Sequence, residues 1–312
     1  MWLTRKKILV TGGSGFLGSY VVRELVRRGA DKRHIIIPRS KKIDLRKERN
    51  CLTATKGIDI IIHLAGNVGG IGKNSLNPAT LFYDNALMGI HLIHAAMKSN
   101  VQKLVIIGTI CAYPKYTPAP FREEDLWQGY PEETNAPYGI AKKMLLVAAQ
   151  AYKQQHKLNS IYLLPVNLYG PGDNFDPTSS HVIPATIRKV YQALKNHESS
   201  IVVWGDGTPT REFLYVEDAA RAIAQATIRY NTLEPINLGS GHEISIKELV
   251  FFITKLMRYK GKIVWDTTKP NGQPRRLLDI SKATNEFGFR ARVPLHIGLK
   301  RTINWFYKHY AT

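Results

Sequence analysis

Two side chains of this sequence, Tyr138 and Lys142, stand four residues apart in a segment with helical character. Positions i and i+4 of a helix lie on the same face, so the phenol and the ammonium can reach each other. The ammonium can lower the pKa of the phenol and bind the ribose of a cofactor. Thr109, at the end of an apolar run, can donate a hydrogen bond to the same substrate oxygen. We therefore expect three donors to converge on one carbonyl group.

A second pattern, TGGSGFLG over residues 11–18, follows a short apolar strand at 7–10 and opens a helical segment at 16–28. In this context Gly12 permits a tight turn, Gly15 lets backbone amides approach a pyrophosphate, and Gly18 allows the helix to pack close to the sheet. The loop, with Ser14, Phe16 and Leu17 as its other members, is predicted to bind a dinucleotide.

The end of the second strand indicates which dinucleotide is bound. An enzyme specific for NAD would carry an acidic residue there to bind the ribose hydroxyls, whereas a 2′-phosphate prefers cations. This chain has Arg39, Ser40 and Lys41 at that position. NADP(H) is therefore the predicted cofactor, with Arg39 as the main contact.

The elements that must position these groups follow an alternating rhythm. Near-continuous apolar runs alternate with segments of helical spacing, which is typical of a parallel sheet covered on both faces. The predicted fold is α/β, a Rossmann-type doubly wound sheet with a smaller C-terminal substrate-binding α/β region. The predicted strands span 34–37, 58–64, 103–107 and 160–164, and the predicted helices 78–98 and 138–156.

Beyond residue 164 the rhythm loosens into a loop at 165–180, and loops of this length in compact proteins are usually functional or disordered. Helices are predicted at 182–195, 216–230 and 246–260, the last with Ser245 and Glu248 as a capping box. We expect an NADP-binding domain at 1–166. After the chain has entered the second region, a segment at about 201–229 is expected to return to this domain. A discontinuous substrate-binding region is expected at 167–312.

The composition narrows the class of protein. Lys and Arg number 44 against 24 Asp and Glu, a formal charge of +20, but the charges are scattered and do not favour nucleic-acid binding. Two cysteines, Cys51 and Cys111, exclude a disulfide framework and a structural zinc site built from cysteines alone. The apolar start is too short for a signal-peptide core, and no run of 18 apolar residues could span a bilayer. A soluble cytoplasmic protein is expected.

The glycine loop, the Tyr-Lys pair and the strand-end hydroxyl together resemble the extended short-chain dehydrogenase/reductase superfamily of nucleotide-sugar enzymes. Further motifs, in order over nearly the whole chain, resemble the GDP-L-fucose synthase family. They are HLA at 63–65, VGGI at 68–71, CAYPK at 111–115, ETNAPY at 133–138, NLYGP at 167–171, DNF at 173–175, SHVIP at 180–184, WGDGTPTREF at 204–213 and KPNGQPRR at 269–276.

The resemblance implies a reaction in two halves on a GDP-4-keto-6-deoxy-hexose: epimerisation at C3 and C5, then reduction at C4 by NADPH. It assigns Cys111 as the base and His181 as the acid of the first half. Alone, a cysteine at a strand end would be interpreted as a small buried hydrophobe. Thr109, Tyr138 and Lys142 would stabilise the enolate oxygen, and Tyr138 would protonate the alkoxide in the second half.

The resemblance also implies the binding residues and a partner. A homodimer through the helices at 78–98 and 138–156 is expected, and GDP would be held partly by Arg211, because a guanidinium can pair with phosphate oxygens at two points. Trp204 has an equally good interpretation as core. Further cofactor contacts are Leu64, Ala65, Pro165, Asn167, Leu168 and His181, and the substrate contacts are Asn167, Val182, Lys189, Trp204, Arg211 and Lys269.

Two positions depart from the family pattern. Thr109 and Ile110 stand where many members have two serines, and Asn67 stands where some have a cation. Relatives acting on other GDP-keto sugars, heptoses among them, share most of these motifs. Two other hypotheses remain: a C4-reductase without epimerase activity, and a catalytically idle member that senses NADP or binds RNA. A 4,6-dehydratase is disfavoured, because Ile110 and Cys111 supply no acidic pair after the threonine.

Overall fold

The computed structural model describes residues 2–310. Its main sheet has six parallel strands in the order β2-β1-β3-β4-β5-β9. These strands are rich in β-branched residues and mostly buried, because helices cover both faces of the sheet. Their bounds are Ile8–Thr11 (β1), Ile35–Ile36 (β2), Ile60–His63 (β3), Lys103–Ile107 (β4), Ser160–Pro165 (β5) and Ile236–Leu238 (β9).

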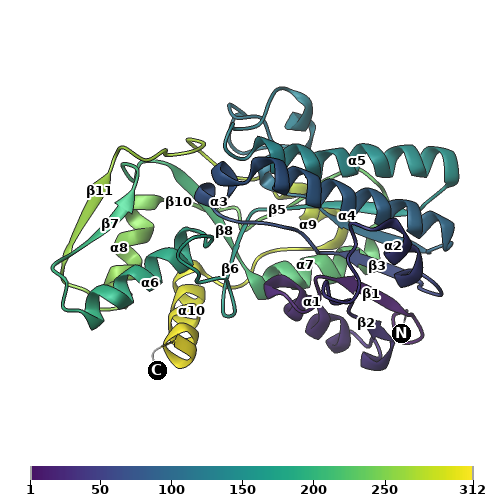
Figure 1. Cartoon of the computed structure of the whole chain (residues 1–312), viewed down its shortest axis with the longest axis horizontal. Coiled ribbons are helices and arrows are strands. Elements are labelled where there is room, and N and C mark those ends of the chain that lie inside the picture. The colour runs from purple at the N-terminus through teal and green to yellow at the C-terminus, as the bar shows by residue number, and fades with distance from the viewer. Residues whose placement is uncertain (1, 311–312) are drawn as a thin grey trace.

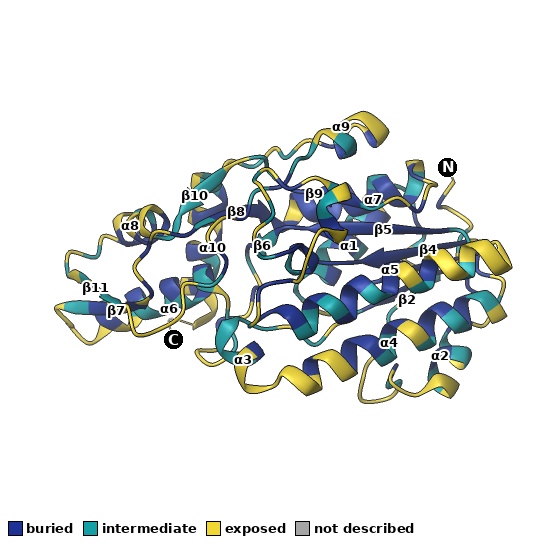
Figure 2. Ribbon diagram, turned by 90° about the horizontal axis from the view of Figure 1, so that it is seen from above, coloured by how far each residue is buried: buried dark blue, intermediate teal, exposed yellow. Residues whose placement is uncertain are grey.

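The helices form two layers around this sheet, as Figures 1 and 2 show. α2, α4 and α5 lie together on one face, and α1, α7 and α9 on the other. The doubly wound α/β fold predicted from the sequence is confirmed. The bounds of the helices are Phe16–Arg27 (α1), Glu48–Ala54 (α2), Pro78–Lys98 (α4), Ala136–His156 (α5), Val216–Arg229 (α7) and Ser281–Phe287 (α9), with single 3-10 turns at Lys32–His34 (η1), Ile110–Ala112 (η2) and Glu123–Trp127 (η3).

A smaller second part, with its own hydrophobic core, lies on the left in Figure 1. One three-stranded sheet has the order β10-β8-β6, and a two-stranded parallel sheet pairs β11 with β7. Helices α6, α8 and α10 contribute aliphatic and aromatic residues to this core. The bounds are Asn167–Tyr169 (β6), Val182–Lys195 (α6), Ser200–Trp204 (β7), Thr210–Tyr215 (β8), Glu243–Ser245 (β10), Ile246–Leu256 (α8), Lys262–Asp266 (β11) and Leu295–Tyr310 (α10).

The segment at 201–229, expected to return to the nucleotide-binding domain, divides between the two parts. Its first strand, β7, pairs with β11 of the small part, whereas α7 packs against α1 of the main part. The strand that extends the main sheet is β9, beyond the expected segment. The capping box of Ser245 and Glu248 at α8 is confirmed. The division at residue 166 stays a prediction.

The short helix α3 (Ile71–Leu76) lies between the two parts in both views. Its preceding residue Gly70 donates a backbone hydrogen bond to the carbonyl of Ser179 at 3.1 Å, and Gly72 lies near the ring of Trp204. In residues 2–310, no helix is long and apolar enough to cross a membrane. The same residues contain no cluster of three metal-ligating side chains.

Candidate active site

The carboxyl end of β4 positions Thr109 and Cys111. After Gly108 the chain turns into η2, and the Thr109 hydroxyl accepts a hydrogen bond from the backbone N–H of Cys111 at 3.2 Å. This bond holds the hydroxyl and the thiol in a single 3-10 turn. Thr109 is buried, whereas Cys111 is partly exposed.

Helix α5 brings Tyr138 to the same turn. The helix starts at Ala136, so Tyr138 lies in its first turn and Lys142 one turn later. Gly139 lets the two elements approach, because a Cβ atom there would lie 2.2 Å from the carbonyl oxygen of Cys111. The predicted group of Thr109, Cys111, Tyr138 and Lys142 thus comes together where β4 meets α5.

The electrostatics of this group differ in one respect from the sequence-based expectation. Burial raises the pKa of Tyr138 above its usual value, the charge of Cys111 adds to this, and a hydrogen bond with Thr109 acts in the opposite direction. Lys142 does not bring the pKa down. The phenol therefore stays protonated at neutral pH, which suits a proton donor. Burial also lowers the pKa of the Lys142 ammonium to about 8.

The pKa of Lys142 predicts how activity depends on pH. A lysine with a pKa of about 8 loses its charge as the pH rises through that value, and with it the attraction for anionic groups. We expect the rate of NADPH oxidation to fall above pH 8, by about tenfold for each further unit. A rate that stays constant from pH 7 to 10 would contradict the role of the ammonium. Lys142→Arg is the control, since a guanidinium remains charged throughout and should remove the decline.

His181, the predicted acid, lies at the start of the small part as the N-cap residue of α6. His181 is exposed at this position. Partial desolvation by neighbouring protein, and then the charge of Arg276, lower the pKa of its imidazole. The loop before it is tied to α3 by the bond between Gly70 and Ser179.

Two buried arginines lie close to the thiol and the imidazole. Burial lowers the pKa of Arg211, with a further contribution from Arg276, while Cys111 and Glu132 raise it. The Arg211 guanidinium donates to the carbonyls of Thr210 and Asn271 at 2.8 and 3.2 Å. A buried positive charge is costly in a protein interior, and an anionic ligand would lower that cost.

The other predicted substrate residues lie on neighbouring elements. Trp204 is 48% exposed, so its interpretation as core is wrong. The Lys269 ammonium lies 5.7 Å from the centre of the Trp204 ring, and the Lys189 ammonium donates to the carbonyl of Val202 at 2.8 Å. The Asn167 amide donates to the carbonyl of Glu212 at 2.9 Å. Val182 is the first residue of α6.

The glycine loop follows β1 at the carboxyl edge of the sheet. There the strand order reverses between β1 and β3, the switch point at which open α/β sheets bind nucleotides. Gly12 has φ of +69°, and a Cβ atom there would lie 2.8 Å from the backbone nitrogen of Ala65. At Gly18 a Cβ atom would lie 2.1 Å from the carbonyl oxygen of Gly12. The loop therefore packs tightly against the segment of Leu64, and its amides start α1, a geometry that fits a dinucleotide pyrophosphate.

An open hollow of about 800 Å³ adjoins this loop. Gly13, Ser14 and Arg39 are among the residues that line it. Ser40 and Lys41 are exposed in the turn after Arg39. The remaining predicted cofactor residues are Phe16 and Leu17 in the first turn of α1, Pro165 at the end of β5 and Leu168 within β6.

Arg39 gives a prediction about cofactor preference. Because a hydrogen bond to a charged group contributes about 1.5–3 kcal/mol, Arg39→Ala should weaken NADPH binding about 10- to 100-fold. Binding of NADH, which lacks the 2′-phosphate, should change less than threefold. Calorimetric titration of both nucleotides measures this, with exposed Lys42→Ala as the control. Equal losses for the two nucleotides would contradict the assignment.

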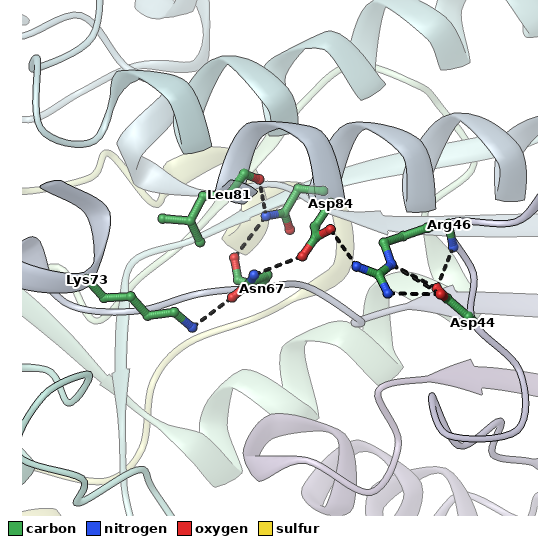
Figure 3. A network of polar contacts seen from close by, with 7 residues as sticks. Asp44, Arg46, Asn67, Lys73, Leu81 and Asp84 are labelled. Carbon is green, nitrogen blue, oxygen red and sulfur yellow. Dashed lines mark hydrogen bonds and ion pairs between the residues drawn. The ribbon is translucent and has the colours of Figure 1, made fainter. Parts of the chain in front are cut away.

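The loop after β3 contains Asn67, one of the positions that depart from the expected family pattern. Here a cation reaches it from α3: the Lys73 ammonium donates to the Asn67 side-chain oxygen at 2.7 Å and to the carbonyl of Val68 at 3.1 Å. The Asn67 amide donates to Asp84, which accepts from Arg46 at 3.0 Å. This network, drawn in Figure 3, ties α3 to α4 and the loop after β2.

Four residues at the site have no role in the sequence prediction. Arg276 ends the motif at 269–276, and Asn135 belongs to the motif at 133–138. Both motifs therefore mark these residues, although the sequence analysis assigns no role to either. Glu132 and Asn74 belong to no such motif: Glu132 lies three residues before Asn135 in the chain, whereas Asn74 meets it only through the fold. All four side chains are less than 10% exposed.

A glycine loop, a Tyr-Lys pair and a strand-end hydroxyl are the parts of a dinucleotide-dependent enzyme that acts on a carbonyl group. The chain belongs to the NAD dependent epimerase/dehydratase family, whose model matches residues 8–239.

Among its relatives, GDP-L-fucose synthase of Sinorhizobium fredii is 39% identical over 311 residues, 99% of this chain and 98% of that protein. A GDP-L-fucose synthetase from Naegleria fowleri, solved with NADP bound, has a TM-score of 0.88 at 29% identity, covering 99% of this chain and 96% of that one. A GDP-6-OMe-4-keto-L-xylo-heptose reductase from C. jejuni has a TM-score of 0.90 at 25% identity, covering 98% of each chain. The resemblance to the GDP-L-fucose synthases is confirmed.

Proposed function

We propose that this enzyme uses NADPH to epimerise C3 and C5 and reduce C4 of a GDP-4-keto-6-deoxy-hexose, giving GDP-L-fucose or a close relative. One observation carries the proposal: Cys111 shares a turn with Thr109 directly against Tyr138. A reductase needs the hydroxyls and the ammonium, but an additional thiol at the same carbonyl suits proton abstraction. The similarity to GDP-L-fucose synthases along the whole chain supports the same substrate class.

In the first half, Cys111 as thiolate takes a proton from the carbon beside the ketone. The C–H electron pair moves to the carbonyl oxygen, which Thr109 and Tyr138 stabilise by donating hydrogen bonds. His181 then returns a proton to the other face of the carbon. Arg211 places positive charge near the sulfur.

In the second half, NADPH bound at the glycine loop would supply the hydride. Tyr138 gives its proton to the C4 oxygen, which suits its protonated state at neutral pH. Lys142 holds the cofactor ribose. The same hydroxyls therefore serve both halves of the reaction.

The GDP end of the substrate is assigned to the loop at 266–276 and to β7 and β8. Arg211 pairs with the pyrophosphate, which replaces its present bonds to backbone carbonyls. Lys189 and Lys269 add positive charge, and the exposed face of Trp204 can stack against the guanine.

The proposed assembly is a homodimer in the cytoplasm. Helices α4 and α5 pack side by side and expose Phe82, Ile90 and Val147. A second copy would cover these apolar side chains.

The test incubates the enzyme, NADPH and GDP-4-keto-6-deoxy-mannose in heavy water and locates deuterium in the product by NMR. Deuterium at C3 and C5 of a product reduced at C4 supports the proposal. Reduction with deuterium at neither carbon would leave a C4-reductase, the second candidate, which the similarity to the heptose reductase favours. No turnover, together with salt-dependent retention of RNA, would support a non-catalytic role.

Cys111→Ser makes the assignment of the base specific. A serine hydroxyl is a far weaker base at neutral pH, so deuterium exchange should fall at least about 100-fold. Direct reduction of a ketone that needs no epimerisation should fall less than tenfold. Equal losses in both reactions would count against a base role for Cys111.

A further inference from the structure

A buried carboxamide lies against the sulfur of Cys111. The thiol is 3.8 Å from the side-chain oxygen of Asn135, within the range for a hydrogen bond from sulfur. Asn135 ends the loop before α5, three residues ahead of Tyr138, and is only 6% exposed. Asn135 is the N-cap residue of α5, but its side chain makes no capping hydrogen bond, so capping does not account for the carboxamide.

The orientation of this carboxamide is determined by its other neighbours. Its nitrogen donates to the carboxylate of Glu132 and, at 3.2 Å, to the hydroxyl of Thr134. Its oxygen accepts from the amide of Asn74 at 2.9 Å. A carboxylate can only accept hydrogen bonds, so a flipped amide would set two oxygens against each other. The oxygen of Asn135 must therefore face Cys111.

Asn74 reaches Asn135 from α3, and α3 is itself held in place. Its neighbour Lys73 is bound to Asn67 in the network of Figure 3, and the residue before the helix, Gly70, is bound to Ser179 beside His181. A Cβ atom at Gly70 would lie 2.6 Å from the carbonyl oxygen of Ser180. One short segment thus contacts the surroundings of both proposed proton-transfer groups.

We infer that Asn135, held by Asn74 and Glu132, is a positioning residue for Cys111. This inference rests on the proposed epimerisation. When the thiolate takes a proton from the sugar, a C–H bond breaks, an S–H bond forms, and the electron pair moves to the carbonyl oxygen. The new S–H donates to the oxygen of Asn135. This bond stabilises the protonated sulfur and turns its hydrogen away from the carbon that His181 then protonates.

The test compares deuterium exchange at C3 and C5 with C4 reduction in Asn135→Ala. Exchange should fall about tenfold more than reduction. In a Cys111→Ser background the same substitution should change the ratio of the two rates less than twofold, because the thiol it positions is gone. An unchanged ratio, or the same fall in both backgrounds, would overturn the inference. Asn159→Ala is the matched control. It removes a half-buried carboxamide just before the first residue of β5, away from the site at the carboxyl end of the sheet.

Asn74→Ala keeps the test usable if Asn135→Ala does not fold. It removes one of the bonds that hold the carboxamide and should lower the ratio of exchange to reduction about threefold. No change in this folded variant would also overturn the inference.

Alkylation of Cys111 by iodoacetamide, followed by mass spectrometry, separates a failure of the inference from a failure of the proposed function. It needs no substrate, and Cys51 is buried, with its thiol donating to the carbonyl of Leu45. Without its acceptor, Cys111 should react about three- to tenfold faster in Asn135→Ala. Absence of exchange in the wild-type enzyme would reject the epimerase function. Equal alkylation rates in the wild-type enzyme and in Asn135→Ala would reject the positioning role, whether or not exchange occurs.

Discussion

Tyr138→Phe is expected to reduce NADPH oxidation by about 10³-fold and deuterium exchange by about 10²-fold. The larger loss arises because reduction needs both a hydrogen bond and a proton from the phenol, and general acid catalysis contributes 10²–10⁴-fold. The smaller loss arises because exchange needs only the hydrogen bond to the enolate oxygen, and one such donor contributes about 10²–10³-fold. Burial raises the pKa of Tyr138, so the proton is present when it is needed.

The pattern is the reverse of the one expected for Cys111→Ser, which slows exchange more than reduction. Both rates are measured on the same samples, by NADPH absorbance and by NMR. If Tyr138→Phe abolishes reduction and leaves exchange at the wild-type rate, the idea of one oxygen site for both halves is wrong. Tyr162→Phe is the matched control. The Tyr162 hydroxyl is also buried and donates to the carbonyl of Lys142 at 2.8 Å, but it has no proposed role in proton transfer.

The parts of the fold that the sequence predicts well are those with long periodic segments. The helices expected at 78–98 and 182–195 match α4 and α6, and the strand at 103–107 matches β4. Each has enough turns or apolar residues for the period to be clear. The helix predicted at 246–260 ends at Leu256, because Arg258 adopts a positive φ of 57°.

Two strands of the small part, β6 and β10, have only three residues each, too few to show a period in the sequence. β6 lies in the segment at 165–180, whose Pro, Gly and Asn residues predict a loop. It exists because β8 pairs with it in register, Asn167 with Phe213 and Tyr169 with Tyr215. The two segments are more than 40 residues apart in the chain, and a strand of three residues is too short to show an alternating hydrophobic pattern of its own. Tertiary context therefore decides its structure.

The candidate site shows the same division. Tyr138 and Lys142 are related by helical spacing, and Thr109 follows a clear strand, so their convergence was predictable. The contact between Asn74 and Asn135 joins a helix between the two parts of the molecule to the start of α5, 61 residues later. No spacing rule connects such positions. Arg276 likewise reaches the surroundings of His181 only through the fold.

Gly139→Ala is expected to lower both exchange and reduction by about 10²-fold, although alanine is the better helix former by about 1 kcal/mol. The added Cβ would lie 2.2 Å from the carbonyl oxygen of Cys111 and 2.9 Å from its carbonyl carbon. Because both atoms are backbone, α5 and η2 must separate by about 1 Å, and a misplacement of this size can reduce catalysis about 10²-fold. Thr109 and Cys111 would then move together away from Tyr138.

The same substitution should reduce the free energy of unfolding by about 1–3 kcal/mol through overpacking, measured by urea denaturation. Gly129→Ala is the control, because its Cβ atom would meet only Pro114, at 3.3 Å. A Gly139→Ala enzyme that is more stable and fully active would show that α5 and η2 do not pack this closely. Loss of exchange alone would show that the thiol depends on this contact but the phenol does not. Loss of both rates at once is what a shared oxygen site requires.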